Sequence, residues 1–194
     1  MKKRPVGIIE RLNKCFTRPL AHRLVGILWI TPNRITWTSA AFAGLLAPLA
    51  IVEDWHIAAA LLVLAGAWLD SLDGDLAQAR GCGSKEGEIL DAVLDRYIDF
   101  ALVVALIYRE PDYLMAGLAA LLGCQMVPYI RARTEAAGKS SIATFGSRDI
   151  RNFILVLGLI TGLYKVLIIV LAVVTNLSAI HRFVSAISPK KSDE

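Results

Sequence analysis

The chain has 194 residues, of which 56% are hydrophobic, and its mean hydropathy is +0.55. This composition is too apolar for an ordinary soluble domain, and the length is too short for several domains. The three cysteines form no spaced motif, and we expect them to be reduced and structural. The net charge of +4 does not indicate nucleic-acid binding, because no soluble basic domain is left to bind it. The sequence therefore predicts one all-α integral membrane domain.

Residues 1–30 form a basic arm in which apolar residues are interleaved with lysine and arginine. No long apolar core follows the charges, so the arm is not typical of a signal peptide. We expect an amphipathic helix that lies on the membrane surface; a simple positive topology anchor is an alternative, and the two are compatible. Thr31-Pro32 then marks the start of the first spanning helix, because proline is favoured in the first helical turn.

Six apolar segments follow, and most of them approach the ~20 residues that a spanning helix needs. They cover residues 34–52, 56–78, 87–108, 112–132, 149–164 and 166–186. We therefore expect six transmembrane helices within one domain at 31–186, preceded by the amphipathic interfacial helix and followed by a polar tail at 187–194. The chain from His181 onward is expected to be a surface extension without an assigned role.

Lysine and arginine are concentrated in the N-terminal arm, in residues 79–86, in residues 131–151 and at the C-terminus. The opposite side has only Arg109 and Lys165, beside acidic residues. Because positive residues favour the cytoplasmic side, we predict a multi-pass protein of the cell membrane with both termini in the cytoplasm. Its basic cytoplasmic face would lie over anionic lipid head groups.

Four carboxylates lie where the second apolar segment ends and the third begins. Asp70 and Asp73 are three residues apart, and Asp91 and Asp95 are four apart, so each pair shares one face of a helix. Acidic side chains at the ends of membrane helices are costly unless something compensates them. Oxygen-only ligands suit Mg²⁺, Mn²⁺ or Ca²⁺ rather than zinc. Two metal ions about 3.5–4 Å apart would suit a phosphoryl-type displacement.

Three further residues lie beside these pairs. Asp99 continues the stripe of the second pair at greater depth, and we expect it to be a structural partner of Arg96 or of a polar group on another helix. Asp75 points away from the first pair and is expected to be a solvated charge at the interface. Gly74 lacks a Cβ atom, so a ligand can approach the backbone there.

A basic cluster surrounds the break between the fourth and fifth segments. Its members are Arg131, Arg133, Lys139, Arg148 and Arg151. Ordinary positive flanking of membrane helices explains most clusters of this kind. The alternative is an anion pocket, in which arginines hold a phosphate group by bidentate hydrogen bonds. Arg131 and Arg133 point in different directions on a helix, so only one of them is expected to face such a pocket.

Residues 70–95 read DSLDGDLAQARGCGSKEGEILDAVLD and resemble the signature of the CDP-alcohol phosphotransferases, D-x2-D-G-x2-A-R-x8-G-x3-D-x3-D. Seven of the eight defined positions match. The exception is Gln78, which stands where the family has an arginine that contacts the nucleotide, and Arg80 follows two residues later. Either Arg80 replaces that contact or the contact is lost.

The resemblance implies an enzyme of phospholipid biosynthesis that transfers a phosphatidyl or archaetidyl group from a CDP-linked lipid to a hydroxyl group and releases CMP. It implies two Mg²⁺ ions, with Mn²⁺ as an alternative, held by the four aspartates, and it makes Asp95 the general base. It also implies a homodimer. The residues implied to bind the donor, CDP-diacylglycerol or CDP-archaeol, are Asn33, Thr36, Gly74, Gln78 and Ser84. Taken alone, Asn33 and Thr36 would be explained by helix-start hydrogen bonding.

The segments YIRARTEA, R-x-x-R and LDAVLDRYID resemble the subgroup that uses inositol phosphate, the phosphatidylinositol phosphate and archaetidylinositol phosphate synthases. The acceptor implied is a phosphorylated polyol, first of all inositol phosphate, with glycerol 3-phosphate as the alternative. The residues implied to bind its phosphate are Arg131, Arg133, Arg148 and Arg151. A carboxylate-lined cation transporter is the non-enzymatic alternative, but it would spread its acidic residues through the membrane depth. The departure at Gln78 also suggests a catalytically inactive scaffold protein as an alternative. The four retained aspartates argue against it.

Overall fold

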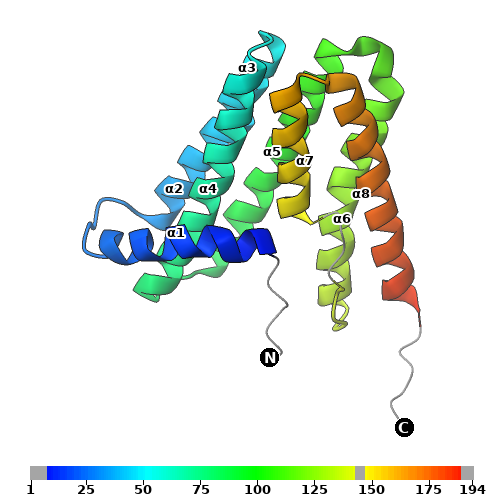
Figure 1. Cartoon of the computed structure of the whole chain (residues 1–194). Coiled ribbons are helices and arrows are strands. Elements are labelled where there is room, and N and C mark those ends of the chain that lie inside the picture. The colour runs from blue at the N-terminus through cyan, green and yellow to red at the C-terminus, as the bar shows by residue number, and fades with distance from the viewer. Residues whose placement is uncertain (1–7, 143–146, 189–194) are drawn as a thin grey trace. The chain divides into compact units, whose positions relative to one another are not determined.

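The computed structural model describes residues 8–142 and 147–188 of the chain (Figure 1). The chain divides into two compact units, residues 1–102 and 103–194, and each is described by itself. Within the described residues every regular element is a helix, so the predicted all-α class is confirmed.

The first unit opens with α1 (Ile8–Leu24), which places a helix in the predicted N-terminal arm. After a short loop the chain continues through α2 (Pro32–Ala41), the π-helical segment η1 (Phe42–Leu46) and α3 (Ala47–Val52). Thr31 caps the start of α2, because its Oγ1 accepts a hydrogen bond of 3.3 Å from the backbone N–H of Arg34. The helix therefore begins where the Thr-Pro pair predicted it to begin.

Two helices of 25 residues each complete the signature region, α4 (His56–Arg80) and α5 (Lys85–Arg109). Gly81 ends α4 with a φ of 62°, a left-handed conformation that glycine adopts without a steric penalty. The chain can therefore turn directly from α4 into α5, which brings the two aspartate pairs of the signature to neighbouring helix ends. The boundary between the two compact units falls within α5.

In the first unit, α1, α2 and α3 all pack against α4. The core of this packing contains the buried residues Ala21, Ile35, Leu72 and Leu76. Gly66 permits the close approach of α2 and η1, because a Cβ atom built there would lie 2.6 Å from the Ala43 Cβ. The Ser39 hydroxyl donates a 2.8 Å hydrogen bond to the Gly66 carbonyl, which fixes the register of α2 on α4.

The second unit contains the short η2 (Pro111–Tyr113) followed by α6 (Leu114–Ala136), α7 (Arg148–Thr161) and α8 (Tyr164–Ile187). Helices α6 and α8 pack against each other, with Gly123 lying against the Thr175 side chain. Asn176 on α8 donates a 2.7 Å hydrogen bond to the Ala119 carbonyl on α6. Small residues and polar contacts of this kind stabilise helix pairs in membranes, where hydrophobic burial does not.

Four helical stretches of the described residues have the length and composition to cross a membrane: Pro32–Val52, His56–Arg80, Pro111–Ala136 and Tyr164–Ile187. They correspond to the first, second, fourth and sixth predicted segments. The third segment forms α5, which begins with several charged residues, and the fifth forms α7, which has 14 residues. The expected surface extension from His181 onward is wrong in its first part, because α8 continues to Ile187 and Arg182 within it is buried.

Candidate active site

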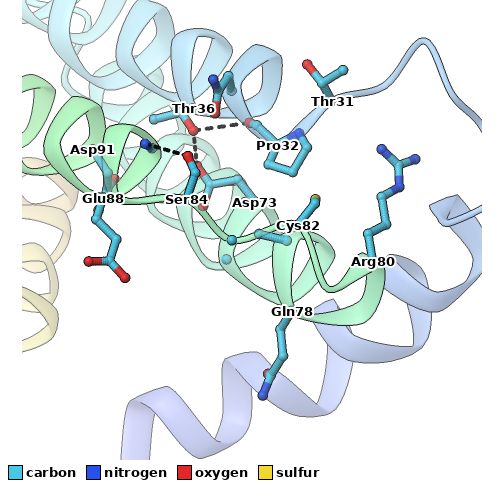
Figure 2. Close-up of a pocket in the computed structure, with 15 residues that line it drawn as sticks. Thr31, Pro32, Thr36, Asp73, Gln78, Arg80, Cys82, Ser84, Glu88 and Asp91 are labelled. Atoms are coloured by element: carbon cyan, nitrogen blue, oxygen red, sulfur yellow. Dashed lines mark hydrogen bonds between the residues drawn. The ribbon is translucent and has the colours of Figure 1, made fainter.

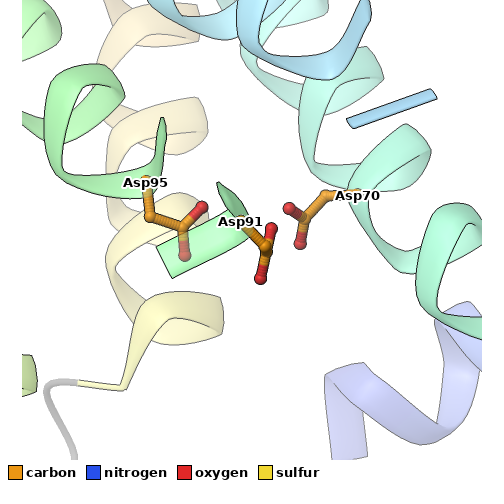
Figure 3. Close-up of side chains that lie close together, drawn as sticks. All are labelled: Asp70, Asp91 and Asp95. Carbon is orange, nitrogen blue, oxygen red and sulfur yellow. The ribbon is translucent and has the colours of Figure 1, made fainter. Parts of the chain in front are cut away.

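Three carboxylates of the signature, one from α4 and two from α5, converge (Figure 3). Asp70 on α4 and Asp91 and Asp95 on α5 each offer one oxygen, and these three oxygens lie within 4.8 Å of one another. Carboxylates this close repel one another unless a cation lies among them. A set of oxygen donors fits a hard divalent cation, so these residues can hold Mg²⁺ or Mn²⁺.

Asp73 lies one turn from Asp70 but outside that group of three. The residue is 8% exposed, and its Oδ2 lies 2.5 Å from the Thr36 Oγ1 (Figure 2). The same hydroxyl lies 3.1 Å from the Pro32 carbonyl oxygen. A hydroxyl group has one proton, so Thr36 donates to only one of these acceptors at a time. Thr36 therefore orients the Asp73 carboxylate, which sequence reasoning did not assign to it.

A cavity of about 570 Å³ lies between the start of α2, the end of α4 and the start of α5 (Figure 2). This volume is typical of sites for small organic ligands. Asp73 and Asp91 contribute to its wall. All the residues expected to bind the CDP-linked lipid line it as well: Asn33, Thr36, Gly74, Gln78 and Ser84.

Two glycines shape this cavity. A Cβ atom added at Gly74 would meet no other atom within 4 Å, so the backbone of α4 is open to the cavity there. A Cβ atom at Gly87 would lie 3.3 Å from the Ser84 Oγ and 3.6 Å from the Asn33 Oδ1. The polar atoms of Ser84 and Asn33 thus both lie close to Gly87 at the start of α5. The Gly87 N–H donates a 3.0 Å hydrogen bond to the Ser84 Oγ, which caps that helix.

Arg96 joins the deeper acidic residues of α5. Its Nη2 lies 3.7 Å from the Asp95 Oδ2 and 3.9 Å from the Asp99 Oδ2. The expected pairing of Asp99 with Arg96 is therefore confirmed. The same guanidinium places a positive charge beside Asp95, the predicted general base. Because Arg96 is on the same helix, it can hold the Asp95 carboxylate in place.

The expectation that Asp75 is a solvated charge is wrong. Its side chain is buried, with the residue 6% exposed, and its Oδ2 accepts a 2.5 Å hydrogen bond from the Thr17 Oγ1. The Arg18 Nε lies 3.8 Å from the Asp75 Oδ1. Asp75 does point away from Asp70 and Asp73, but α1 covers that face of α4. The residue therefore fastens α1 to the helix that carries the metal-ligand candidates.

The predicted phosphate-binding arginines belong to the second unit, and two arginines there are strongly buried. Arg151 is 2% exposed and Arg182 is 7% exposed. Arg182 lies within electrostatic range of Arg131, Arg151 and Glu135, and its Nη1 donates a 3.1 Å hydrogen bond to the Val127 carbonyl. The structure thus gathers positive charge at these ends of α6, α7 and α8. Arg182 is the member that sequence reasoning missed.

The other predicted arginines differ in their environments. Arg131 is half-buried and its Nε lies 3.1 Å from the Glu135 Oε1, one turn further along α6. Arg133 is exposed, and Arg148 is half-buried at the start of α7. Arg131 and Arg133 thus point in different directions, as their spacing predicted. Arg182 could have been identified from the sequence as a charged residue near the end of an otherwise apolar helix.

Residues 29–182 match the CDP-alcohol phosphatidyltransferase family. The chain belongs to this family. The match covers most of the chain, so the resemblance carried by residues 70–95 is confirmed. This CDP-alcohol phosphatidyltransferase family member, with its long apolar helices, is a membrane protein.

Curated relatives of this family member differ in length. The chain is 35% identical over 186 residues to the bifunctional IPC transferase and DIPP synthase of Aquifex aeolicus, covering 90% of this chain and 42% of that protein. It is 35% identical over 144 residues to the phosphatidylinositol phosphate synthase of Corynebacterium glutamicum, covering 70% and 66%. It is 31% identical over 160 residues to the archaetidylinositol phosphate synthase of Pyrococcus horikoshii, covering 82% and 85%. The chain thus spans less than half the length of the bifunctional relative.

Solved structures of a similar enzyme also match the chain. The chain superposes on Mycobacterium tuberculosis phosphatidylinositol phosphate synthase crystallised with CDP-DAG, with a TM-score of 0.80 and 27% identity, covering 92% of this chain and 98% of that one. A second structure of that enzyme, in complex with manganese and citrate, also gives a TM-score of 0.80 and covers 92% and 93%.

Proposed function

We propose that this protein transfers a phosphatidyl or archaetidyl group from a CDP-linked lipid to a hydroxyl group of inositol phosphate and releases CMP. The observation that carries the proposal is the convergence of three signature carboxylates within 4.8 Å, next to a cavity of about 570 Å³. Relatives named for inositol phosphate lipids support this choice of acceptor. The reaction belongs to phospholipid biosynthesis.

The cavity is the proposed site for the cytidine diphosphate part of the donor, CDP-diacylglycerol or CDP-archaeol. Asn33, Thr36, Gly74, Gln78 and Ser84 line it and are the proposed contacts. The crystal structure of a similar enzyme with CDP-DAG supports this assignment. Gly74 would let the nucleotide lie against the backbone of α4, because no other atom occupies that space.

We propose that Asp70, Asp91 and Asp95 hold divalent metal, with Asp73 as the fourth ligand. We propose that two Mg²⁺ ions bind there, with Mn²⁺ as an alternative. The manganese complex of a similar enzyme supports the binding of a divalent metal. When bound, such ions stabilise the charge that develops on the transferring and leaving oxygens, and this stabilisation usually contributes most to catalysis of this kind.

The proposed transfer forms a bond between a hydroxyl oxygen of the acceptor and the lipid-side phosphorus. The bond from that phosphorus to the CMP oxygen breaks, and CMP leaves. Asp95 is the proposed general base that accepts the hydroxyl proton. A carboxylate is a far weaker base than an alkoxide, so it accepts the proton only as the new bond develops. Arg96, 3.7 Å from Asp95, would hold its carboxylate in place.

The phosphate of the acceptor is proposed to bind the arginines of the second unit. Arg131, Arg133, Arg148 and Arg151 are the predicted contacts, and the buried Arg182 is added because it lies near Arg131 and Arg151. Buried guanidinium groups favour a bound phosphate strongly, since little water competes for it. Glycerol 3-phosphate also carries a phosphate group that these arginines could bind, and it is the alternative acceptor.

The proposed membrane arrangement has six spans, with α5 and α7 counted beside the four apolar stretches. It retains the predicted divisions: an interfacial arm at 1–30 that contains α1, a transmembrane catalytic domain at 31–186 and a polar tail at 187–194. Both termini lie in the cytoplasm of a cell-membrane protein in this proposal, and the protein is a homodimer. The distribution of lysine and arginine supports the orientation.

Release of CMP by the purified protein in detergent tests the function. The assay contains Mg²⁺ and CDP-diacylglycerol, or CDP-archaeol in a parallel series, with inositol phosphate, glycerol 3-phosphate, serine or inositol as the only acceptor. We expect release with inositol phosphate and its loss in Asp91→Asn. Glu86→Gln removes a charge from the exposed first turn of α5 and should retain activity. Absence of release with every pair of substrates would contradict the proposal and favour the inactive scaffold suggested by Gln78, and Gln78→Arg would then be tested for restored activity.

A further inference from the structure

Arg80, the last residue of α4, is bound almost completely by backbone carbonyls of the loop between α1 and α2. Its Nε donates to the Val25 carbonyl at 3.2 Å, and its Nη1 donates to the Ile30 carbonyl at 2.7 Å. Its Nη2 donates to the Leu24 carbonyl at 2.7 Å and to the Ile27 carbonyl at 2.9 Å. A guanidinium has five N–H donors, so one remains for other partners.

These donors add to the backbone hydrogen bonds that the loop makes within itself. Leu24 ends α1, and the last carbonyls of a helix have no partner within the helix. The loop then makes two successive turns, in which Ile27 N–H donates to the Leu24 carbonyl and Ile30 N–H donates to the Ile27 carbonyl. A positive charge at this place also matches the negative end of the α1 dipole. The Arg34 Nη1 also donates to the Trp29 carbonyl of this loop at 2.6 Å, on the exposed side.

The same loop leads directly into the wall of the proposed donor site. Thr31, Pro32 and Asn33 follow it and line the cavity, and Thr36, one turn later, contacts Asp73. Figure 2 shows Arg80 extending toward the segment that carries Thr31. The position of these residues therefore depends on how the loop is held against the end of α4.

We propose that Arg80 is a positioning residue for the donor site, and this inference rests on the proposed function. Arg80 fastens the α1–α2 loop to α4 and so holds the start of α2, with Asn33 and Thr36, at the cavity. Arg80 itself lines the cavity, but four of its five donors are committed to the loop carbonyls, so it holds the loop and does not take over the nucleotide contact of the family arginine that Gln78 replaces. Of the two alternatives left open by the sequence, the loss of that contact is therefore favoured.

Hydrogen–deuterium exchange of the ligand-free protein in detergent tests the attachment of the loop. In Arg80→Gln we expect the amides of residues 24–34 to exchange about tenfold faster or more, because several charge-assisted hydrogen bonds are lost. Arg80→Lys keeps the charge but not the planar fork, so it should restore the slow exchange only in part. Arg23→Gln, an exposed arginine on the last turn of α1, is the matched control and should leave the exchange unchanged.

Steady-state kinetics test the consequence for the donor site. In Arg80→Gln we expect the KM for CDP-diacylglycerol to rise about tenfold, with kcat and the KM for the acceptor changing less than about threefold. An arginine that contacted the nucleotide directly would leave the exchange of the ligand-free loop unchanged, and that result overturns the proposal. Faster exchange with an unchanged donor KM overturns it as well. If the unaltered protein released no CMP, the proposed function would fail separately, and the exchange comparison would still decide whether Arg80 fastens the loop.

Discussion

The contact between Thr36 and Asp73 can be tested by a single substitution. Both residues are buried, and the hydroxyl lies 2.5 Å from the carboxylate. Thr36→Val keeps the shape of the side chain but removes its donor. A hydrogen bond to a charged group contributes about 1.5–3 kcal/mol, and the carboxylate that loses it stays buried. Since 1.4 kcal/mol corresponds to about a factor of ten, the change should weaken a process that depends on this carboxylate by about 10- to 100-fold.

If Asp73 is a metal ligand, that process is metal binding. Thr36→Val should raise the Mg²⁺ concentration for half-maximal CMP release by about 10- to 100-fold, as is usual when a group that orients a ligand is removed. Thr36→Ser retains the hydroxyl and should stay within about threefold of the unaltered protein. Thermal unfolding at increasing Mg²⁺ concentrations gives a readout that does not depend on turnover. The Mg²⁺ concentration that gives half of the maximal stabilisation should rise by the same factor.

A matched control lies on another face of the same helix. Thr38 is exposed, and its hydroxyl donates at 2.8 Å to the Arg34 carbonyl of its own helix. Thr38→Val should leave the dependence on Mg²⁺ unchanged. The reasoning is refuted if Thr36→Val has the normal dependence on Mg²⁺ and raises only the KM for the CDP-linked lipid. In that case Thr36 would act on the nucleotide, as the family resemblance implied, and not through Asp73.

Three further predictions concern the general base, the cavity and the attachment of α1. Asp95→Asn removes the proposed general base, so kcat should fall by about 10²- to 10⁴-fold in the CMP-release assay, and full turnover would contradict the assignment. Gly74→Ala should leave thermal unfolding nearly unchanged, because its Cβ would meet no atom within 4 Å, yet raise the donor KM about tenfold or more by filling ligand space. Thr17→Val removes the hydrogen bond to buried Asp75, so the described amides of α1 should exchange about tenfold faster. Arg18→Gln loses only an exposed ion pair and should change exchange less than about threefold; equal effects of the two would refute this account.

The helices of this protein could be predicted closely from local sequence. The segment expected at 56–78 is α4 (His56–Arg80), and the segment expected at 166–186 is α8 (Tyr164–Ile187). Apolar runs fix the body of such helices, and a glycine such as Gly81 ends them, so both signals are local. The convergence of Asp70 with the α5 aspartates was also predictable, because helical spacing and one short connection determine it.

Long-range partners could not be predicted in the same way. Asp75 was assigned correctly to the far face of α4, but its partner Thr17 is 58 residues earlier in the chain. The Val127 carbonyl that binds Arg182 is 55 residues from it, and the carbonyls that bind Arg80 are at least 50 residues from it. Periodicity shows which side chains share a face, but only packing determines what covers that face. The sequence therefore placed Asp75 and the segment that contains Arg182 at the surface, and it left the partner of Arg80 open.

Helix α4 connects these separate features through its last three turns. Asp73 and Asp75 are two residues apart, so about 200° of rotation separates them, and they contact different helices. Asp73 faces Thr36 on α2, whereas Asp75 faces Thr17 on α1, and Arg80 binds the loop that joins α1 to α2. A displacement of α1 would therefore pull on the same loop that leads to Asn33 and Thr36. We therefore expect the attachment of α1 and the geometry of the cavity to be coupled, although none of the described side chains of α1 lines the cavity.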